Sequence, residues 1–228
     1  MFRGINDIFF DLDHTLWDFE RNSALTFKKI LNENDVRIDV ASFLEIYRPI
    51  NLGYWKVYRE NRISKEDLRY NRLKETFDTL GYQASDELID ILSERYIECL
   101  SDFGHLIPNA LEILEYLAPK YNLHIITNGF QEAQKNKMRN SNIQHFFQKI
   151  IDSETAGVKK PHPQIFEVAL DQAKTSANAS LMIGDNLEAD ILGAQAMGMH
   201  VLHFNFHKEP QHQICRMINN LDEIKTLL

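Results

Sequence analysis

Continuous apolar runs separated by amphipathic segments constrain the fold of this chain more than any other feature of its sequence. The runs are continuous rather than alternating, which is typical of strands buried on both faces of a parallel sheet. Four such runs span 5–10, 123–127, 181–184 and 200–204, and a weaker fifth spans 149–152. Predicted helices lie between the later runs, at 109–117, 131–140, 163–172 and 187–197. This alternation predicts an α/β fold with a doubly wound parallel sheet, in which ligands bind beyond the carboxyl ends of the strands.

The segment between the first and second strands breaks the alternation, because it contains no convincing strand. Its helices are predicted at 20–33, 41–60, 64–80 and 85–100. Ser64 followed by Asp67, and Ser85, are helix start signals. The sequence therefore predicts an α/β core of residues 1–17 and 104–228 with an inserted helical bundle at 18–103. We expect the bundle to serve as a lid, with hinges at its two connections to the core.

The composition and charge of the chain limit the kinds of molecule that it is expected to bind. The chain has 228 residues, 44% of them hydrophobic and 25% charged, which is typical of a globular protein. Its net charge of -8, without a basic stripe, argues against a surface for polymeric nucleic acid. The chain has no apolar stretch long enough for a membrane span and no leader-like start, so we expect a cytoplasmic protein with reduced Cys99 and Cys215. A small-molecule phosphate ester remains a possible partner, and the sequence does not indicate an oligomeric state.

The segment Asp11-Leu12-Asp13-His14-Thr15 directly follows the first apolar run. A carboxylate at a strand end can attack phosphorus if a cation offsets the repulsion between anions and a second group handles the proton of the leaving group. Asp11 and Asp13 can divide that work. Taken alone, the segment is equally well explained as an Asp-rich turn.

Three further polar clusters stand at or near predicted strand ends. They are Thr127-Asn128-Gly129, Lys159-Lys160-Pro161 and the stretch from Gly184-Asp185 to Asp190. The Thr127 hydroxyl and the amides of Asn128 and Gly129 are donors suited to phosphoryl oxygens. Lys160 stands before Pro161, which is predicted to open a helix and to direct the ammonium group into the site.

The order and strand context of the four clusters resemble the haloacid dehalogenase superfamily of phosphatases, whose motifs read DxDxT, then T or S, then K, then GDxxxxD. The resemblance covers essentially the whole chain, including the helical cap. It implies that Asp11 is the nucleophile and that Asp13 is the acid and base. It also implies a Mg²⁺ cofactor held by Asp11, Asp185 and the backbone carbonyl of Asp13.

The same resemblance assigns the remaining roles. Thr127, Asn128, Gly129 and Lys160 would bind the phosphoryl group, with Thr127 and Lys160 also counted as catalytic. Asp190 would orient Lys160 or bind the metal through water. The alternative explanation is structural: an acidic residue near the start of a helix is favoured by the helix dipole. His162 departs from the acidic residue often found in the family.

The predicted cap contains aromatic residues that are candidates for substrate specificity. The candidates are Tyr54 and Tyr58 within the cap and Trp17 at its entrance, because aromatic rings stack on bases, and Arg62 nearby in the cap. The alternative is that the stripe containing Tyr54 and Tyr58 forms the core of the bundle. The first motif through Asp18, together with cap residues 53–55 and 62–64, is most similar to the pyrimidine 5′-nucleotidase branch. This favours a phosphomonoesterase that acts through an aspartyl-phosphate on nucleoside monophosphates.

Several alternatives remain open at the level of sequence. A sugar-phosphate or phosphoglycolate phosphatase, or a β-phosphoglucomutase-like phosphomutase, would share all four clusters. A haloacid dehalogenase is disfavoured by Asp13 and Asp185, since its chemistry needs neither an acid at that position nor a metal. A catalytically silent regulatory or binding protein with the same fold is the non-enzyme alternative. The histidines at 200, 203, 207 and 212 are interpreted as surface or core residues rather than as a metal site, and His14 is not assigned a catalytic role.

Overall fold

The structure, a computed structural model, describes residues 2–228, and the chain divides into two compact units. The core unit runs to Phe19 and resumes at Gly104, and the helical unit spans Glu20–Phe103. In the core unit, six strands form one sheet in the order β3-β2-β1-β4-β5-β6, and each pairs in parallel with its neighbours. The predicted parallel α/β sheet is confirmed.

Burial explains why the strands read as continuous apolar runs. All four residues of β1 are buried, as are all five of β4. The strands are β1 (Asp7–Phe10), β2 (Asn122–Thr127), β3 (Phe147–Asp152), β4 (Ser180–Gly184), β5 (His200–Phe204) and β6 (Arg216–Ile218). Because β1 lies between β2 and β4, the loop that follows it occupies the centre of the carboxyl edge.

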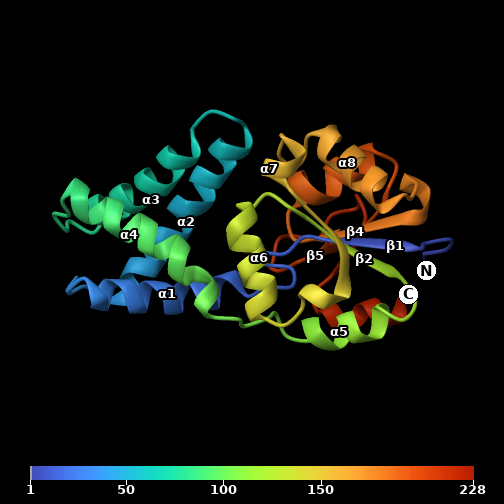
Figure 1. Ribbon diagram of the computed structural model, residues 1–228, viewed down its shortest axis with the longest axis horizontal. Helices are drawn as coiled ribbons and strands as arrows, with labels where there is room; N and C mark the ends of the chain where they lie inside the picture. Colours follow the sequence, from blue (N-terminus) through green and yellow to red (C-terminus); the bar gives the residue numbers. More distant parts are fainter. Residues whose placement is uncertain (1) are drawn as a thin grey trace. The chain divides into compact units, whose positions relative to one another are not determined.

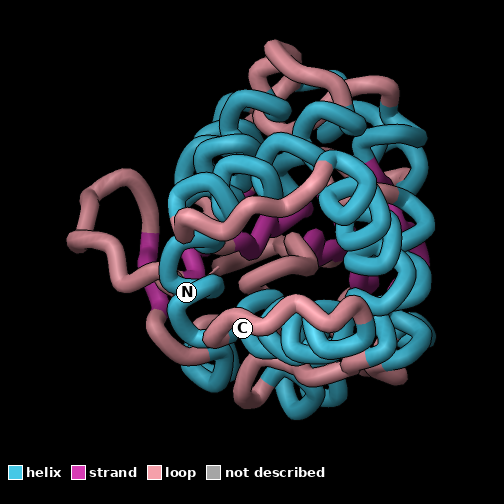
Figure 2. Tube along the Cα trace, turned by 90° about the vertical axis from the view of Figure 1, so that its left-hand side faces the viewer, coloured by secondary structure: helices cyan, strands magenta, loops and turns pink. Residues whose placement is uncertain are grey.

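Helices cover both faces of this sheet (Figures 1 and 2). On one face, Ile165 and Phe166 of α8 and Ala194 of α9 pack into a cluster with Phe9 and Met182 of the sheet. In Figure 1, α5 and the red C-terminal helix η5 lie on the opposite side of the sheet from α8. The helices of the core unit are α5 (Ala110–Leu117), α6 (Gln131–Asn140), α7 (Ser153–Ala156), α8 (Pro163–Ala173) and α9 (Gly193–Ala196), with the 3₁₀ helices η2 (Gln144–Phe146), η3 (Ala177–Ala179) and η5 (Leu221–Thr226).

The structure differs from the sequence-based expectations at three places. The segment 187–197 is not one regular helix: a π-helix, η4 (Leu187–Leu192), precedes α9. Strand β6 was not predicted, because its three residues carry too short an apolar pattern. Pro161 does not open a helix; α8 begins at Pro163, and the Lys160–Pro161 peptide bond is cis. His162 caps α8, since its Nδ1 accepts a hydrogen bond from the Gln164 amide at 3.2 Å.

The helical unit is built around aromatic rings. Phe27 stacks on Tyr96 with ring centroids 4.6 Å apart, and Phe43 packs against Phe77 at 5.5 Å. The helices are α1 (Phe19–Glu33), α2 (Val40–Arg59), α3 (Lys65–Thr79) and α4 (Asp86–Cys99), followed by the 3₁₀ helix η1 (Leu100–Asp102). Ser64 and Asp67 form a reciprocal capping box at the start of α3, as their spacing predicts. None of the helices in residues 2–228 has both the length and the apolar character needed to cross a membrane.

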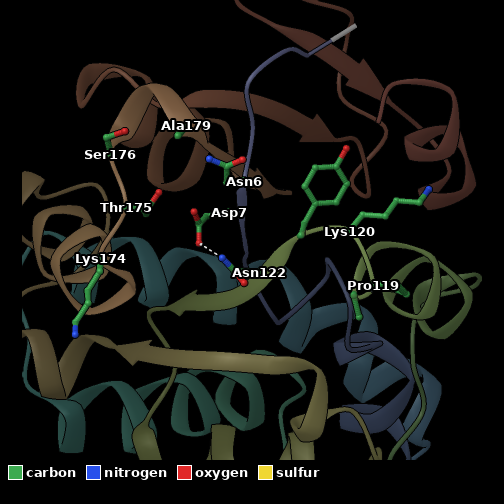
Figure 3. Close-up of a pocket in the computed structure, with 11 residues that line it drawn as sticks. Asn6, Asp7, Pro119, Lys120, Asn122, Lys174, Thr175, Ser176 and Ala179 are labelled. Atoms are coloured by element: carbon green, nitrogen blue, oxygen red, sulfur yellow. Dashed lines mark hydrogen bonds between the residues drawn. The ribbon is translucent and has the colours of Figure 1, made fainter.

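A polar depression and the residues of the four motifs lie at opposite ends of the sheet. At the amino ends of β1 and β2, a depression of about 810 Å³ is lined by polar residues that include Asn6, Asp7 and Asn122 (Figure 3). Asn122 donates a hydrogen bond to Asp7 there at 3.1 Å. The residues of the four motifs lie at the opposite, carboxyl end, where the loops after β1, β2 and β4 begin.

Candidate active site

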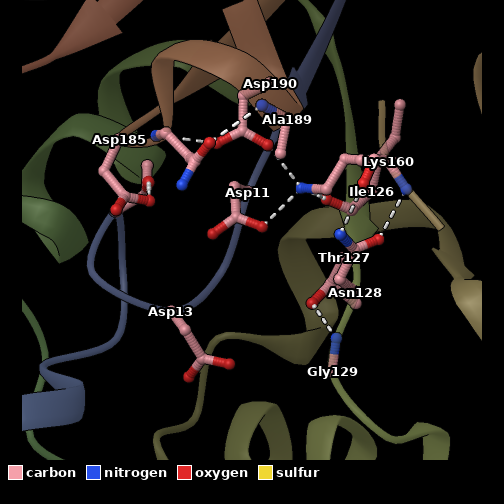
Figure 4. Close-up of polar contacts among 12 residues, drawn as sticks. Asp11, Asp13, Ile126, Thr127, Asn128, Gly129, Lys160, Asp185, Ala189 and Asp190 are labelled. Atoms are coloured by element: carbon pink, nitrogen blue, oxygen red, sulfur yellow. Dashed lines mark hydrogen bonds and ion pairs between the residues drawn. The ribbon is translucent and has the colours of Figure 1, made fainter. Parts of the chain in front are cut away.

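Four segments bring the predicted site residues together at the carboxyl edge of the sheet (Figure 4). Asp11 follows β1, Thr127 ends β2, and Asp185 follows β4. Lys160 comes from the loop before α8. All of these residues belong to the core unit.

Lys160 links three parts of the site. Its side chain is 2% exposed, and its Nζ lies 2.6 Å from Asp11 Oδ1, 2.6 Å from the Ile126 carbonyl oxygen and 2.7 Å from Asp190 Oδ1. The contacts with Asp11 and the Ile126 carbonyl oxygen are hydrogen bonds, and the contact with Asp190 is an ion pair. Burial alone would lower the pKa of Lys160, but Asp11 and Asp190 raise that pKa above its ordinary value. Lys160 is therefore held as a buried cation.

Three carboxyl groups, those of Asp11, Asp185 and Asp190, lie around the single ammonium group of Lys160. Burial raises the pKa of Asp11 well above its ordinary value, against the attraction of Lys160, and the charges of Asp190 and Asp185 add to the rise. Burial likewise raises the pKa of Asp190. At Asp185, burial is outweighed by a hydrogen bond from His207 and by nearby positive charge, so its pKa is lowered. The cluster as it stands is short of positive charge.

These carboxylates fit a divalent cation. One oxygen each of Asp11, Asp185 and Asp190 lies within 4.8 Å of the other two, and all three residues are buried. Mg²⁺ prefers hard oxygen ligands and uses only one or two carboxylates besides water and phosphate. Asp190 is already engaged, because its Oδ1 pairs with Lys160 and its Oδ2 accepts from the Asn186 amide at 3.0 Å. Asp190 therefore holds Lys160 and the start of η4, and Asp11 and Asp185 are the candidate ligands; Asp185 would give up its contact with Thr15 or His207 to bind the ion.

The side chain of Asn128 contacts the backbone of Lys160. Its Oδ1 accepts from the Lys160 amide at 2.7 Å, and its Nδ2 donates to the Lys160 carbonyl oxygen at 2.9 Å. This pair of bonds fastens the Lys160 backbone to the end of β2. The Gly129 amide donates inward to Thr127 Oγ1 at 3.1 Å.

The Asp13 carboxylate points away from the Asp11–Lys160 group (Figure 4), and side chains of α6 contact it. Lys137 Nζ lies 2.7 and 2.9 Å from its two carboxylate oxygens, and Gln134 Nε2 donates to Asp13 Oδ2 at 2.9 Å. Both α6 side chains are buried. The Lys137 ammonium also lies 4.5 Å from the centroid of the Trp17 ring.

Two histidines interpreted from sequence as surface or core residues contact Asp185. His207 Nε2 lies 3.0 Å from Asp185 Oδ2, and His203 Nε2 lies 2.9 Å from the Asp185 carbonyl oxygen. His14 Nδ1 is 4.0 Å from Asp185 Oδ2, and Thr15 Oγ1 donates to Asp185 Oδ1 at 3.3 Å. Asp185 is therefore held from several sides.

The specificity candidates lie in different surroundings, each within its own unit. Trp17, in the core unit, is fully buried. In the helical unit, Tyr58 is buried, Tyr54 donates a hydrogen bond to Glu75 at 2.8 Å, and Arg62 is exposed and paired with Glu60 at 2.6 Å.

Sequence reasoning missed Gln134, Lys137 and His207. The two α6 residues stand at an i, i+3 spacing on a helix that follows a motif strand, which places them on one face. This spacing could have identified Gln134 and Lys137 as candidate site residues from the sequence. His207 lies in the loop after β5, and no pattern in the sequence predicts the path of that loop.

Residues 8–204 match the model of the haloacid dehalogenase-like hydrolase family, and the chain belongs to this family. The pyrimidine 5′-nucleotidase PynA of Streptococcus pneumoniae is 30% identical over 207 residues, which cover 90% of this chain and 86% of that protein. The pyrimidine 5′-nucleotidase YjjG of Escherichia coli is 28% identical, with 97% and 96% covered. A glyceraldehyde 3-phosphate phosphatase of Pyrococcus abyssi is 31% identical, with 90% and 83% covered.

Solved structures support the same assignment. The magnesium-bound crystal structure of the putative HAD-hydrolase YfnB from Bacillus subtilis matches with a TM-score of 0.86 at 27% identity, covering 98% of both chains. The L-2-haloacid dehalogenase of Xanthobacter autotrophicus matches with a TM-score of 0.75 at 18% identity, also covering 98% of both chains, and this likeness concerns the fold alone.

Proposed function

We propose that this hydrolase is a Mg²⁺-dependent phosphomonoesterase in which Asp11 forms an aspartyl-phosphate. The observation that carries the proposal is the buried group in which Lys160 bridges Asp11 and Asp190, with the Asp185 carboxylate beside them. Asp13, two residues after Asp11, adds the proton-handling group that a phosphate ester requires. A dehalogenase has no use for that group.

In the first step, a carboxylate oxygen of Asp11 attacks phosphorus, and the bond from phosphorus to the ester oxygen breaks. The departing alkoxide takes a proton from the Asp13 carboxyl group. Lys160 and the Thr127 hydroxyl hold phosphoryl oxygens as charge shifts onto them. Mg²⁺ bound by Asp11, Asp185 and the Asp13 backbone carbonyl would offset the repulsion between the Asp11 carboxylate and the phosphoryl group.

In the second step, water attacks the phosphorus of the aspartyl-phosphate and gives a proton to the Asp13 carboxylate. The bond between phosphorus and the Asp11 oxygen breaks, which releases inorganic phosphate and restores the Asp11 carboxylate. Asp13 thus alternates between acid and base, and the site returns to its starting state.

We further propose a nucleoside 5′-monophosphate, with a pyrimidine base preferred, as the substrate. The relatives PynA and YjjG, each named as a pyrimidine 5′-nucleotidase, support this class. The similarity to a glyceraldehyde 3-phosphate phosphatase supports a second candidate, a small sugar phosphate. The site residues of the core unit recognise the phosphoryl group, which both classes share.

A phosphate-release screen separates these classes. The panel contains pyrimidine and purine nucleoside monophosphates, sugar phosphates and phosphoglycolate, each with and without Mg²⁺. We expect pyrimidine monophosphates to give the highest kcat/KM. A profile led by sugar phosphates supports the second candidate, and no Mg²⁺-dependent hydrolysis across the panel contradicts the enzymatic proposal.

The Asp11→Asn variant tests the nucleophile. An amide cannot form the aspartyl-phosphate, so kcat on the best substrate should fall by a factor on the order of 10³ or more. The matched control is Asp171→Asn, because Asp171 is an exposed carboxylate of α8. Near wild-type turnover by Asp11→Asn contradicts the assignment.

A further inference from the structure

The face of α6 that carries Gln134 and Lys137 connects two site groups that the proposed reaction uses separately. Gln134 Nε2 lies 2.9 Å from Asp13 Oδ2 and 2.6 Å from Thr127 Oγ1. Lys137 Nζ contacts both oxygens of Asp13. The result is a continuous chain of polar contacts from Lys137 through Asp13 and Gln134 to Thr127.

Resting on the proposed phosphatase function, we propose that Lys137 and Gln134 are positioning residues. Lys137 holds the Asp13 carboxyl group on the side away from Asp11, where in-line displacement would place the oxygen of the leaving group, and Gln134 directs the Thr127 hydroxyl toward the phosphoryl group. The function of the site then depends on α6 as well as on the four sequence motifs.

The contacts of Asp13 define the orientation of its carboxyl group. A carboxyl group that gives up a proton through one oxygen still accepts hydrogen bonds at the other, so both donors can remain during proton transfer. Lys137 is 3% exposed and lies against the Trp17 ring at 4.5 Å, which limits the positions its ammonium can take. Loss of this contact would let Asp13 rotate away from the productive direction.

The contacts of Thr127 define the direction of its own proton. Its Oγ1 accepts from Gln134 Nε2 and from the Gly129 amide at 3.1 Å. A hydroxyl has two acceptor lone pairs and one proton, so the proton must point away from both donors. The Gln134 amide is oriented in turn, because its NH₂ group donates to both Thr127 Oγ1 and Asp13 Oδ2.

Gly129 shows how closely this arrangement is packed. A Cβ placed on Gly129 would lie 2.1 Å from Gln134 Nε2 and 2.4 Å from Gln134 Cδ. The glycine in Thr127-Asn128-Gly129 is therefore needed for Gln134 to reach Thr127. This observation links the second motif to α6 independently of the contacts to Asp13.

The leaving group provides a test that a merely structural role would not affect. An aryl phosphate releases a phenolate, which is stable without protonation, whereas an alkyl phosphate such as a nucleoside monophosphate releases an alkoxide that needs the proton of Asp13. The quantity to compare is kcat/KM. This ratio depends only on the steps up to and including the first irreversible one, so the later attack of water on the aspartyl-phosphate does not affect it.

The experiment measures kcat/KM of Lys137→Met for p-nitrophenyl phosphate and for the best nucleoside monophosphate. We expect a loss of about 100-fold on the alkyl ester, within the range attributed to general acid catalysis, and a loss at least tenfold smaller on the aryl ester. Lys137→Arg should restore part of the activity on the alkyl ester, because it keeps the charge but changes the geometry of its donors. The matched control is Lys135→Met, since Lys135 lies on the exposed face of α6 and should keep the wild-type ratio.

Gln134→Leu should behave differently from Lys137→Met, because it also releases Thr127. We expect it to weaken both esters and to be non-additive with Thr127→Val in a double-mutant cycle. Thermal unfolding checks that each variant folds. If Lys137→Met does not fold, Lys137→Gln is compared on the two esters instead.

The outcomes separate the two proposals. Equal losses on the two esters, or a Lys135→Met effect equal to that of Lys137→Met, overturn the positioning role and leave the proposed function intact. A wild-type protein that hydrolyses neither ester overturns the proposed function, and the positioning role falls with it.

Discussion

At the scale of single residues, close contacts decide which side chains the site tolerates. Gly184 ends β4 beside Asp190, and a Cβ built on it would lie 2.3 Å from Asp190 Oδ2 and 2.5 Å from Asp190 Cγ. Since Asp190 pairs with Lys160 at 2.7 Å, any side chain at position 184 displaces a partner of the central lysine. The glycine is part of the site although it has no functional group.

We expect Gly184→Ala to lower both activity and stability. A buried carboxylate separated from its cation and forced against a methyl group should cost about 2–4 kcal/mol in the free energy of unfolding. Thermal unfolding and kcat on the best phosphate ester measure the two effects. The control is Gly53→Ala in the middle of α2, where a Cβ meets nothing within 4 Å and should stabilise the helix by up to about 1 kcal/mol. An active, fully stable Gly184→Ala variant would contradict the argument.

At the scale of elements, strands β1 to β5 and the positions of the motif residues at their ends were predictable, but β6, the start of α8 and the details of the other helices were not. Asp11 and Asp185 could be placed from sequence because each directly follows a buried apolar run, and the ends of parallel strands meet at one edge. Lys137 could be assigned to a helix, but which side chain its face contacts depends on how α6 rotates against the sheet. His207 depends on a loop whose path no local pattern specifies.

The π-helix η4 is the clearest case of an element that local propensity does not predict. The segment was expected to be a regular helix, yet the amide of Ile191 donates to the Asn186 carbonyl oxygen, five residues back, at 3.3 Å. The side chain of Asn186 caps this turn by accepting from the Ala189 amide at 2.8 Å. Wide turns of this kind occur at functional sites, and here the turn returns Asp190 to Lys160.

Asn186→Ala should loosen the turn that carries Asp190. Loss of a cap costs about 1 kcal/mol, and because Asp185 directly precedes Asn186, the Mg²⁺ concentration needed for half-maximal activity should also rise. Ser64→Ala is the matched control, since Ser64 caps α3 in the helical unit by accepting from the Asp67 amide at 2.9 Å. Both variants should lose similar stability in thermal unfolding, and only Asn186→Ala should change the Mg²⁺ requirement. Equal Mg²⁺ requirements in the two variants would show that the cap does not support the site.

At the scale of the whole molecule, the insertion of the helical unit divides the core unit into two chain segments. Asp11 and Asp13 precede the insertion, whereas Thr127, Lys160 and Asp185 follow it. Because β1 pairs with both β2 and β4, the short first segment is held at the centre of the sheet. The candidate site is therefore assembled only when both segments have folded together.

This assembly leaves the folded core unit with a concentration of negative charge that a divalent cation should relieve. The raised pKa values of Asp11 and Asp190 mean that the folded state binds protons more tightly than the unfolded chain. Ionising these groups as the pH rises from the ordinary carboxyl range toward neutrality therefore destabilises the metal-free fold. A cation that binds the carboxylates opposes this loss, so the stabilisation by Mg²⁺ should be greater at neutral pH than near pH 4.

Mg²⁺ should accordingly raise the Tm of the core unit. At 100 times its dissociation constant, a ligand that binds only the folded state adds about 2.7 kcal/mol, which corresponds to a rise of roughly 5–10 °C for a chain of this size. Thermal unfolding with Mg²⁺ or with EDTA measures the shift. Asp185→Asn should abolish most of it, whereas Asp171→Asn, on the exposed face of α8, should keep it. The same shift in both variants would place the stabilising ion elsewhere on this acidic chain.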